Sequence, residues 1–294
     1  MKDIKKAQIL DTAIDLFRSK GYSATSMQDI AEACEVAKAS IYKCFTSKED
    51  LFTAAFVACH QTLLEQAAEL ERSGMAFGLF SKDKLSRQIE FYLYYILENH
   101  LFMVEFSELP ITENESFIEA RKKMQAALLI WRKEMLIEAF SEQLEPYIWD
   151  AVMLFQGILH EYMKGVLLKV ISQPIPALAV YIVDRMEAVV HDLIQTAPQS
   201  IAGEWIIEGG LSGHNDPAAR KGTINEFLTA MVERIHTLPL SATSRTELIE
   251  VVGLLRREIQ SEKPDLTLLR VLKGHLEAVP ELRSYLRQLR LLLT

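Results

Sequence analysis

Residues 21–51, GYSATSMQDIAEACEVAKASIYKCFTSKEDL, carry the closely spaced helix boundaries that decide the fold of the N-terminal region. Gly21 follows an amphipathic run and can adopt the left-handed conformation that ends a helix. Thr25 is a favourable N-cap residue, and Gln28, three residues later, can complete a capping box. The stretch therefore predicts that one helix ends near Gly21 and that a second begins directly after Thr25.

A short break at Glu35 and Val36 separates this second helix from a third. Ile41 and Phe45 lie four residues apart, which is the spacing of two buried side chains on one helical face. Helix, tight turn and helix in this order form a helix-turn-helix, whose second helix enters the major groove of DNA. The motif therefore predicts binding to double-stranded DNA.

The outward face of the third helix is expected to suit DNA, because no acidic residue occurs between Lys38 and Lys48. Small residues at the start of the helix allow close approach to base edges, while the Tyr42 hydroxyl and the Lys43 ammonium can reach phosphates. Lys48 follows Ser47, the expected N-cap of the next helix, so it adds a cation to a positive helix end that favours phosphate. Such contacts predict salt-dependent binding.

Three segments in order resemble the TetR family of bacterial transcription regulators: LFRSKGYSATSMQDIA, VAKASIYKCF and SKEDLF, over about residues 9–52. The resemblance implies an all-helical homodimer with an N-terminal DNA-binding head and a larger C-terminal body. The body of such proteins dimerises and usually holds an effector pocket. Members generally repress by occupying operator DNA, and they release it when a small molecule binds.

The resemblance also implies roles for residues of the head. Thr25 and Ser26, at the start of the second helix, would contact the DNA backbone. Lys38, Ala39 and Ser40, at the start of the third helix, would face bases. Phosphates would be held by Tyr42, Lys43 and Lys48.

Three positions depart from the usual family pattern. Glu35 replaces a common Gly, which either strains a left-handed position or indicates a slightly different turn. Ala37 replaces the usual Ser or Thr cap, at a cost of about 1 kcal/mol to the third helix. Cys44 stands where an aromatic residue or His is more usual.

Beyond the motif, apolar residues recur at helical spacing along the chain, and hairpin signals are absent. The expected fold class is all-α: a three-helix helix-turn-helix DNA-binding domain, a helical dimerisation and effector domain, and a C-terminal helical extension. The expected helices cover 3–19, 26–33, 37–44, 48–72, 82–99, 101–108, 115–143, 147–171, 175–196, 223–237, 244–260, 265–278 and 280–292.

Glycine and proline indicate where the domains divide. The segment from Gly203 to Gly222 contains five glycines and Pro217, a composition that ends helices and favours a linker. The predicted domains are therefore 1–47 for DNA binding, 48–200 for ligand binding and dimerisation, 201–222 as a linker, and 223–294 as the C-terminal extension.

The last long helices before the linker, 147–171 and 175–196, are the predicted dimerisation pair. Small residues at Ala151, Gly157 and Gly165 would let helices of two protomers approach closely in a four-helix interface. The alternative is that Gly157 and Gly165 pack within one protomer.

Aromatic and polarizable side chains of the body suit a small apolar or amphipathic effector with few polar groups. The alternative for each is an ordinary core position, because aromatic residues at helical spacing are usually buried. The expected pocket residues are Tyr95, Phe102, Phe106, Trp131, Phe155, His160 and Tyr162.

The final helix combines a basic face of Arg283, Arg287 and Arg290 with a neighbouring leucine face. It is expected to be a solvated face over a helical bundle, with a protein partner or an auxiliary DNA contact as the alternatives. A regulator controlled by a protein partner through this extension is therefore the second functional hypothesis.

Charge and composition exclude other classes of function. The formal net charge is -8, yet residues 1–50 carry eight basic and eight acidic residues and residues 201–294 carry twelve of each, so the excess lies in residues 51–200. Three cysteines without close pairing predict reduced thiols, no metal site and a cytoplasmic protein. No apolar run long enough for a membrane span and no catalytic motif occurs, so we expect neither membrane insertion nor enzyme activity, and no cofactor.

Overall fold

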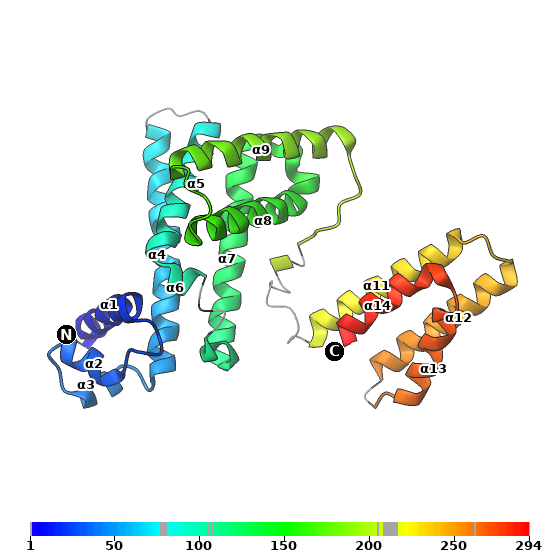
Figure 1. The fold of residues 1–294 in the computed structure, drawn as a ribbon, viewed down its shortest axis with the longest axis horizontal. Coiled ribbons are helices and arrows are strands. Elements are labelled where there is room, and N and C mark those ends of the chain that lie inside the picture. The colour runs from blue at the N-terminus through cyan, green and yellow to red at the C-terminus, as the bar shows by residue number, and fades with distance from the viewer. Residues whose placement is uncertain are drawn as a thin grey trace. The chain divides into compact units, whose positions relative to one another are not determined.

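The computed structural model describes residues 2–76, 81–104, 106, 109–204, 206–207, 217–261 and 263–293. Within these ranges every regular element is a helix, which confirms the predicted all-α fold class (Figure 1). The chain divides into two compact units, Met1–Gly210 and Leu211–Thr294. None of the helices in the described ranges combines the length and the apolar character needed to cross a membrane.

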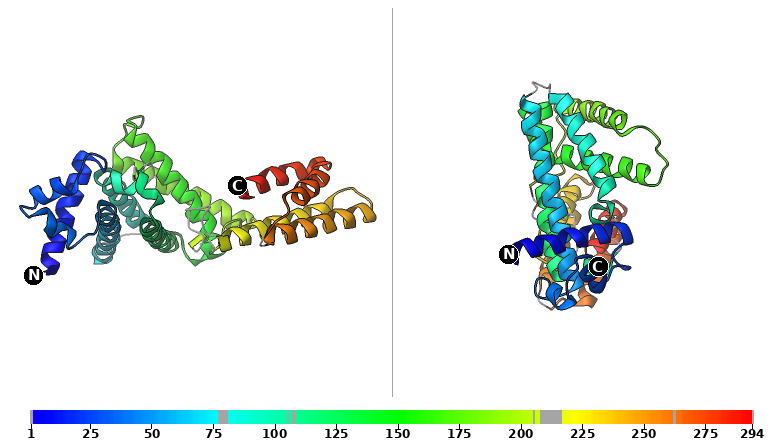
Figure 2. Two further views of the ribbon diagram at one scale, coloured as in Figure 1. Left: turned by 90° about the horizontal axis from the view of Figure 1, so that it is seen from below. Right: turned by 90° about the vertical axis from the view of Figure 1, so that its left-hand side faces the viewer.

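The head consists of one long helix, two short helices and the start of a second long helix. These are α1 (Lys2–Lys20), α2 (Met27–Ala33), α3 (Lys38–Tyr42) and α4 (Lys48–Ala76). Helix α4 continues from the head into the body of the first unit, as Figure 2 shows. The head and the body therefore share one continuous helix.

The body contains four long helices and three short ones, close to the predicted ranges. They are α5 (Ser81–Glu98), α6 (His100–Met103), η2 (Pro110–Glu113), α7 (Glu115–Phe140), η3 (Glu142–Tyr147), α8 (Ile148–Leu167) and α9 (Ile175–Thr196). The predicted helix over 101–108 is wrong in length, because α6 ends at Met103. Val104 leaves the helical region with φ −132° and ψ −57°, and Leu109 is extended before Pro110, as residues preceding proline usually are.

The core of the head extends beyond the head itself. Phe17 of α1 lies 5.2 Å from Phe52 of α4, measured between ring centroids, and Phe52 lies 5.2 Å from Phe102 of α6. Phe117 of α7 joins the same buried cluster. The head is therefore packed on α4, α6 and α7. Its hydrophobic core continues across the predicted domain boundary at residue 47.

The segment after α9 is only partly a linker. The Asp150 carboxylate of α8 accepts hydrogen bonds from the backbone N–H groups of Ile201 and Ala202, at 3.1 and 3.0 Å, and Ile206 is buried in the core of the body. The next described helix begins at Pro217. The predicted linker 201–222 is therefore too long at both ends.

The second unit is a helical bundle with its own core of aliphatic side chains. It contains α11 (Pro217–Thr237), α12 (Ala242–Gln260), α13 (Leu266–Glu277), η4 (Pro280–Leu282) and α14 (Arg283–Leu293). Leu286 and Leu289 of α14 are buried in that core, whereas Arg283, Arg287 and Arg290 are exposed. The basic face of the last helix is thus solvated, as expected.

Candidate functional site

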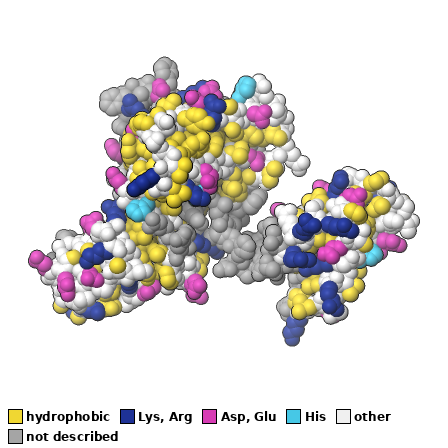
Figure 3. Space-filling model, viewed as in Figure 1, with side chains coloured by type: hydrophobic (Ala, Val, Ile, Leu, Met, Phe, Trp, Pro, Cys, Tyr) yellow, Lys and Arg dark blue, Asp and Glu magenta, His cyan; other side chains and the backbone are white. Residues whose placement is uncertain are grey.

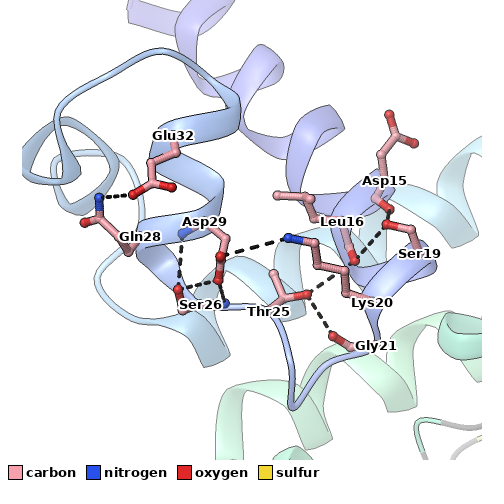
Figure 4. Close-up of polar contacts among 10 residues, drawn as sticks. All are labelled: Asp15, Leu16, Ser19, Lys20, Gly21, Thr25, Ser26, Gln28, Asp29 and Glu32. Carbon is pink, nitrogen blue, oxygen red and sulfur yellow. Dashed lines mark hydrogen bonds and ion pairs between the residues drawn. The ribbon is translucent and has the colours of Figure 1, made fainter.

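The second helix begins one residue later than the caps predicted. Ser26 is the N-cap of α2: its Oγ accepts a hydrogen bond from the Asp29 N–H at 3.1 Å, and the Asp29 carboxylate accepts one from the Ser26 N–H at 2.8 Å (Figure 4). This reciprocal pair is a capping box. Gln28 instead donates to the Glu32 carboxylate at 2.8 Å, so the expected pairing of Thr25 with Gln28 is wrong.

Thr25 has a structural position in the turn between α1 and α2. Its side chain is 1% exposed, and its hydroxyl donates to the carbonyl oxygens of Gly21 at 2.8 Å and Leu16 at 3.3 Å. Gly21 itself has φ +82° and closes α1, as expected from its lack of a Cβ atom. The Thr25 side chain is therefore not available to a phosphate, and the neighbouring Ser26 is exposed instead.

The turn between α2 and α3 contains a left-handed residue without a glycine. Glu35 has φ +54°, which identifies the strained turn among the two alternatives considered for this position. Its N–H donates to the Glu32 carbonyl at 3.0 Å, and the Val36 N–H donates to the Ala31 carbonyl at 2.9 Å. Ala37 is the N-cap of α3 and supplies no side-chain hydrogen bond, as expected from its methyl group.

Replacing Glu35 by glycine should therefore stabilise the protein. The left-handed conformation costs a residue with a Cβ atom about 1–2 kcal/mol of stability. Glycine avoids this cost, but the greater conformational freedom of glycine in the unfolded chain lowers stability by about 0.5–1 kcal/mol. We expect Glu35→Gly to raise the free energy of unfolding by about 0.5–1 kcal/mol. Urea denaturation should show this, and Glu35→Ala is the control. An equal rise in the free energy of unfolding in both variants would show that the loss of the Glu35 charge, and not the relief of backbone strain, causes the stabilisation.

Helix α3 presents its polar residues outward and is held by two apolar side chains. Ile41 is fully buried and Phe45 is 2% exposed, whereas Tyr42 is 46% exposed. Lys38, Ala39 and Lys43 are also exposed, and Ser40 is half-buried. The structure thus brings the third-helix residues predicted from the sequence onto one accessible element.

Lys48 lies at the first turn of α4 beside an aromatic ring. Ser47 Oγ accepts a hydrogen bond from the Asp50 N–H at 3.1 Å, which caps the helix as predicted. The Lys48 Nζ lies 4.2 Å from the centroid of the Tyr22 ring, and partial burial lowers the pKa of its ammonium despite the acidic Glu49 nearby. Lys48 is therefore a positioned cation at a helix start, where anions are favoured.

Acidic and basic side chains are both visible on the face of the head in Figure 3. This mixture agrees with the balanced charge of residues 1–50. A local basic element, not an overall basic domain, is therefore the feature available to DNA.

The structure does not bring the seven expected pocket residues together. Tyr95, Trp131 and Phe155 are buried in the body core, whereas Phe102 and Phe106 pack in the core shared with the head. His160 points outward, with a side chain 64% exposed and 3.4 Å from Glu161. Tyr162 packs against Tyr181 of α9, with ring centroids 5.7 Å apart. The aromatic character of the other six residues agrees with the alternative of ordinary core packing, whereas His160 is exposed, and the seven residues do not form one common site.

Two polar residues of the body core were not among the residues expected from the sequence. Arg132 of α7 is 7% exposed, and its guanidinium donates to the Tyr92 hydroxyl at 2.6 Å. His60 of α4 is 4% exposed, and its Nδ1 lies 2.9 Å from the Phe56 carbonyl oxygen. The signal that could have identified Arg132 is its place four residues after Leu128 on the apolar face of α7.

The buried His60 predicts a loss of stability in mild acid. Burial lowers the pKa of its imidazole from 6.5 to about 4. The unfolded chain therefore binds a proton between these values while the folded chain does not, so stability falls as the pH falls through this window. We expect a loss of about 2 kcal/mol between pH 7 and pH 5 from this residue. In His60→Gln, urea unfolding should lose this part of the pH dependence; an unchanged profile would contradict the assignment.

The three small residues of α8 have different surroundings. Ala151 is fully buried in the protomer, so it cannot lie in an interface between protomers. A Cβ atom at Gly165 would lie 2.5 Å from the Cδ1 atom of Ile171, so this glycine packs within one protomer. Gly157 is exposed, and a Cβ atom there would meet nothing within 4 Å. Of the three, Gly157 is therefore the residue available to a partner.

Comparison with known proteins identifies the head. The family described as "Bacterial regulatory proteins, tetR family" matches residues 9–55. The uncharacterized HTH-type transcriptional regulator YuxN of Bacillus subtilis is 23% identical over 98% of this chain and 97% of its own length. YerO of the same organism, described in the same words, is 26% identical over 88% of this chain and 85% of its own length.

Both alignments extend far beyond the head, so the architecture shared with YuxN includes the second unit. A solved structure of a TetR-family transcriptional regulator from Streptomyces coelicolor has the same fold, with a TM-score of 0.50 and 16% identity, over 78% of this chain and 97% of that chain. These relatives are named as regulators and not as enzymes. Residues 9–55 therefore match the helix-turn-helix DNA-binding domain of the tetR family, and the chain as a whole is similar to proteins named as HTH-type transcriptional regulators.

Proposed function

We propose that the protein is a homodimeric repressor that occupies operator DNA and releases it when a small molecule binds the body. The observation that carries the proposal is the exposed face of α3. The helix is held in place by Ile41 and Phe45, which are buried in the core of the head. In a major groove, Lys38, Ala39 and Ser40 would face bases. Phosphate contacts are assigned to Ser26, Tyr42, Lys43 and Lys48.

Dimerisation is proposed through the outer faces of α8 and α9. Leu154 is 47% exposed, Val180 is 52% exposed and Tyr181 is 46% exposed, which is unusual for side chains of this size on two neighbouring helices. Gly157 leaves the centre of the α8 face open. Two such pairs would form a four-helix interface in which each protomer contributes the same surface.

A chain of contacts is available to transmit an event in the body to the head. The Arg18 guanidinium of α1 donates to the Asn99 side-chain oxygen between α5 and α6. Asn99 donates to the Tyr95 carbonyl at 2.9 Å, and the Tyr95 hydroxyl donates to the Cys59 carbonyl of α4 at 2.6 Å. A shift of α5 or α6 would therefore change how α1 and α4 hold α3 in the operator.

Selection from a pool of random duplexes tests this function. The full-length protein should enrich a pseudo-palindromic site, because two symmetric heads read two half-sites spaced by whole helical turns. A reporter carrying this site should be repressed when the protein is expressed. Failure to enrich any sequence, or enrichment of a single half-site bound by one protomer, would overturn the proposal.

Exposed apolar residues of the second unit favour one alternative, control by a protein partner. Leu266 is 79% exposed and Val271 is 59% exposed on α13. In this alternative, Val271→Glu would leave operator binding intact and abolish regulation in cells. Under the proposed small-molecule control, the same variant would respond as the wild type does.

A further inference from the structure

The buried face of α7 contains a cation that has no acidic partner among the residues that the structure describes. Arg132 is 7% exposed, and among the described residues no carboxylate lies within ion-pair distance of it. Its guanidinium reaches two neutral groups, the Tyr92 hydroxyl at 2.6 Å and the Gln156 Oε1 at 3.4 Å. Its Nε is buried without a hydrogen-bond partner.

Lys84 is a second buried cation among the described residues of the body, and it is paired. The Lys84 side chain is 8% exposed, and it forms an ion pair with Glu138 of α7. Buried charges are normally paired in this way, because an isolated charge in an apolar core is strongly destabilising. Arg132 departs from that rule: its guanidinium lies 5.4 Å from the centroid of the Tyr92 ring, but no acidic side chain of the described residues pairs with it.

Other unused hydrogen-bond donors accompany Arg132. The indole Nε1 of Trp131 is buried and has no partner among the described residues. The Tyr92 ring lies 5.7 Å from the Trp131 ring and its hydroxyl oxygen accepts from Arg132, so the hydroxyl hydrogen can be donated elsewhere. His60 lies near enough for Arg132 to contribute to the lowering of its pKa, so the neighbouring imidazole is neutral and offers no negative charge.

We propose that Arg132, with the Tyr92 hydroxyl and the Trp131 indole N–H, binds the carboxylate of an amphipathic effector. The planar guanidinium matches a carboxylate with two parallel hydrogen bonds. Phe155 and Met135 are buried in the same apolar core as Tyr92 and Trp131, which suits an apolar body attached to that carboxylate. A monoanion is favoured over a phosphate dianion, because a second buried charge would have no partner.

This inference rests on the proposed effector control, and ligand binding tests it without DNA. Trp131 and Trp149 are buried in the first unit, and residues 211–294 contain no tryptophan, so tryptophan fluorescence of the full chain reports the melting of the first unit. The probes are straight-chain carboxylates from hexanoate to tetradecanoate, phenylalkanoates, and the alcohol of matching length for each. At least one carboxylate should raise the melting temperature by about 3 °C or more, and its alcohol should not.

Arg132→Met is the decisive variant. Without ligand it should melt at or above the wild-type temperature, because it replaces an unpaired buried charge by an apolar side chain of similar length. The carboxylate should bind it about 10- to 100-fold more weakly. Arg132→Lys should retain part of the affinity, and the exposed Arg72→Met should retain all of it.

Three results would overturn the inference. The first is that no carboxylate raises the wild-type melting temperature. The second is that the carboxylate raises the melting temperature of Arg132→Met as much as that of the wild type. The third is that, without ligand, Arg132→Met melts far below the wild type or fails to fold. The last result would show that Arg132 stabilises the empty core through Tyr92 and Gln156. Failure of operator selection with retained carboxylate binding would instead reject the proposed repressor function and leave the anion site intact.

Discussion

Phe102→Ala should lower the free energy of unfolding of the first unit by about 3–5 kcal/mol, the usual cost of removing a fully buried phenyl ring. Phe102 is 0% exposed and belongs to α6, yet its neighbours are Phe52 of α4 at 5.2 Å and Phe17 of α1 at 6.3 Å. The cavity would therefore open where the head meets the body, and the head should loosen first. Urea unfolding followed by tryptophan fluorescence measures the loss.

The control for Phe102→Ala is Tyr94→Ala on α5, whose side chain is 45% exposed. Surface truncations of this kind usually change stability by less than about 0.5 kcal/mol. Hydrogen exchange of α1 should accelerate in Phe102→Ala and remain unchanged in the control. A loss below about 1 kcal/mol, or unchanged protection of α1, would show that α6 does not support the head.

Gly157→Arg should separate the protomers and abolish operator binding without unfolding the chain. A side chain at this position meets nothing within 4 Å in its own protomer, and Arg has a higher helix propensity than Gly. In the proposed interface the guanidinium would be buried against the same residue of the partner, so two like charges would meet. We expect at least about a 100-fold weaker dimer, measured by analytical ultracentrifugation.

Gly157→Ala provides the matched control, because it adds a methyl group without a charge. It should melt at or slightly above the wild-type temperature and remain a dimer. A Gly157→Arg protein that still sediments as a dimer would place the interface elsewhere. A Gly157→Arg monomer that binds the selected operator as tightly as the wild type would contradict the requirement for two heads.

The fold was predictable to a large extent because its signals are local. Gly21 and Ser47 mark helix ends through backbone conformation and capping, and these properties depend on the residue and its near neighbours. The cap of α2 was misassigned by one residue because Thr25 and Ser26 are both capable caps. The burial of Thr25, which tertiary contacts determine, left Ser26 at the helix start.

The candidate sites of the body were less predictable because they depend on which side chains meet in space. Helical spacing correctly indicated that Phe102 and Phe155 are buried, but it could not assign them to different cores. It also could not indicate that His160 faces outward. Arg132 was missed because a charged residue in an amphipathic helix is usually exposed. Its position four residues after Leu128 indicates the buried face, but only the three-dimensional surroundings reveal that no acidic side chain of the described residues pairs with it.

The salt dependence of operator binding tests the central claim most directly. Fluorescence anisotropy with the selected duplex gives the binding constant at salt concentrations from about 50 to 200 mM for the wild type and for Lys43→Ala. Two protomers that each lose one phosphate contact should reduce the slope of log K against log salt by about 2, and weaken binding to all sequences alike. The exposed Lys123→Ala of α7 is the control and should leave the slope unchanged. An unchanged slope and affinity in Lys43→Ala would contradict the placement of α3 on DNA.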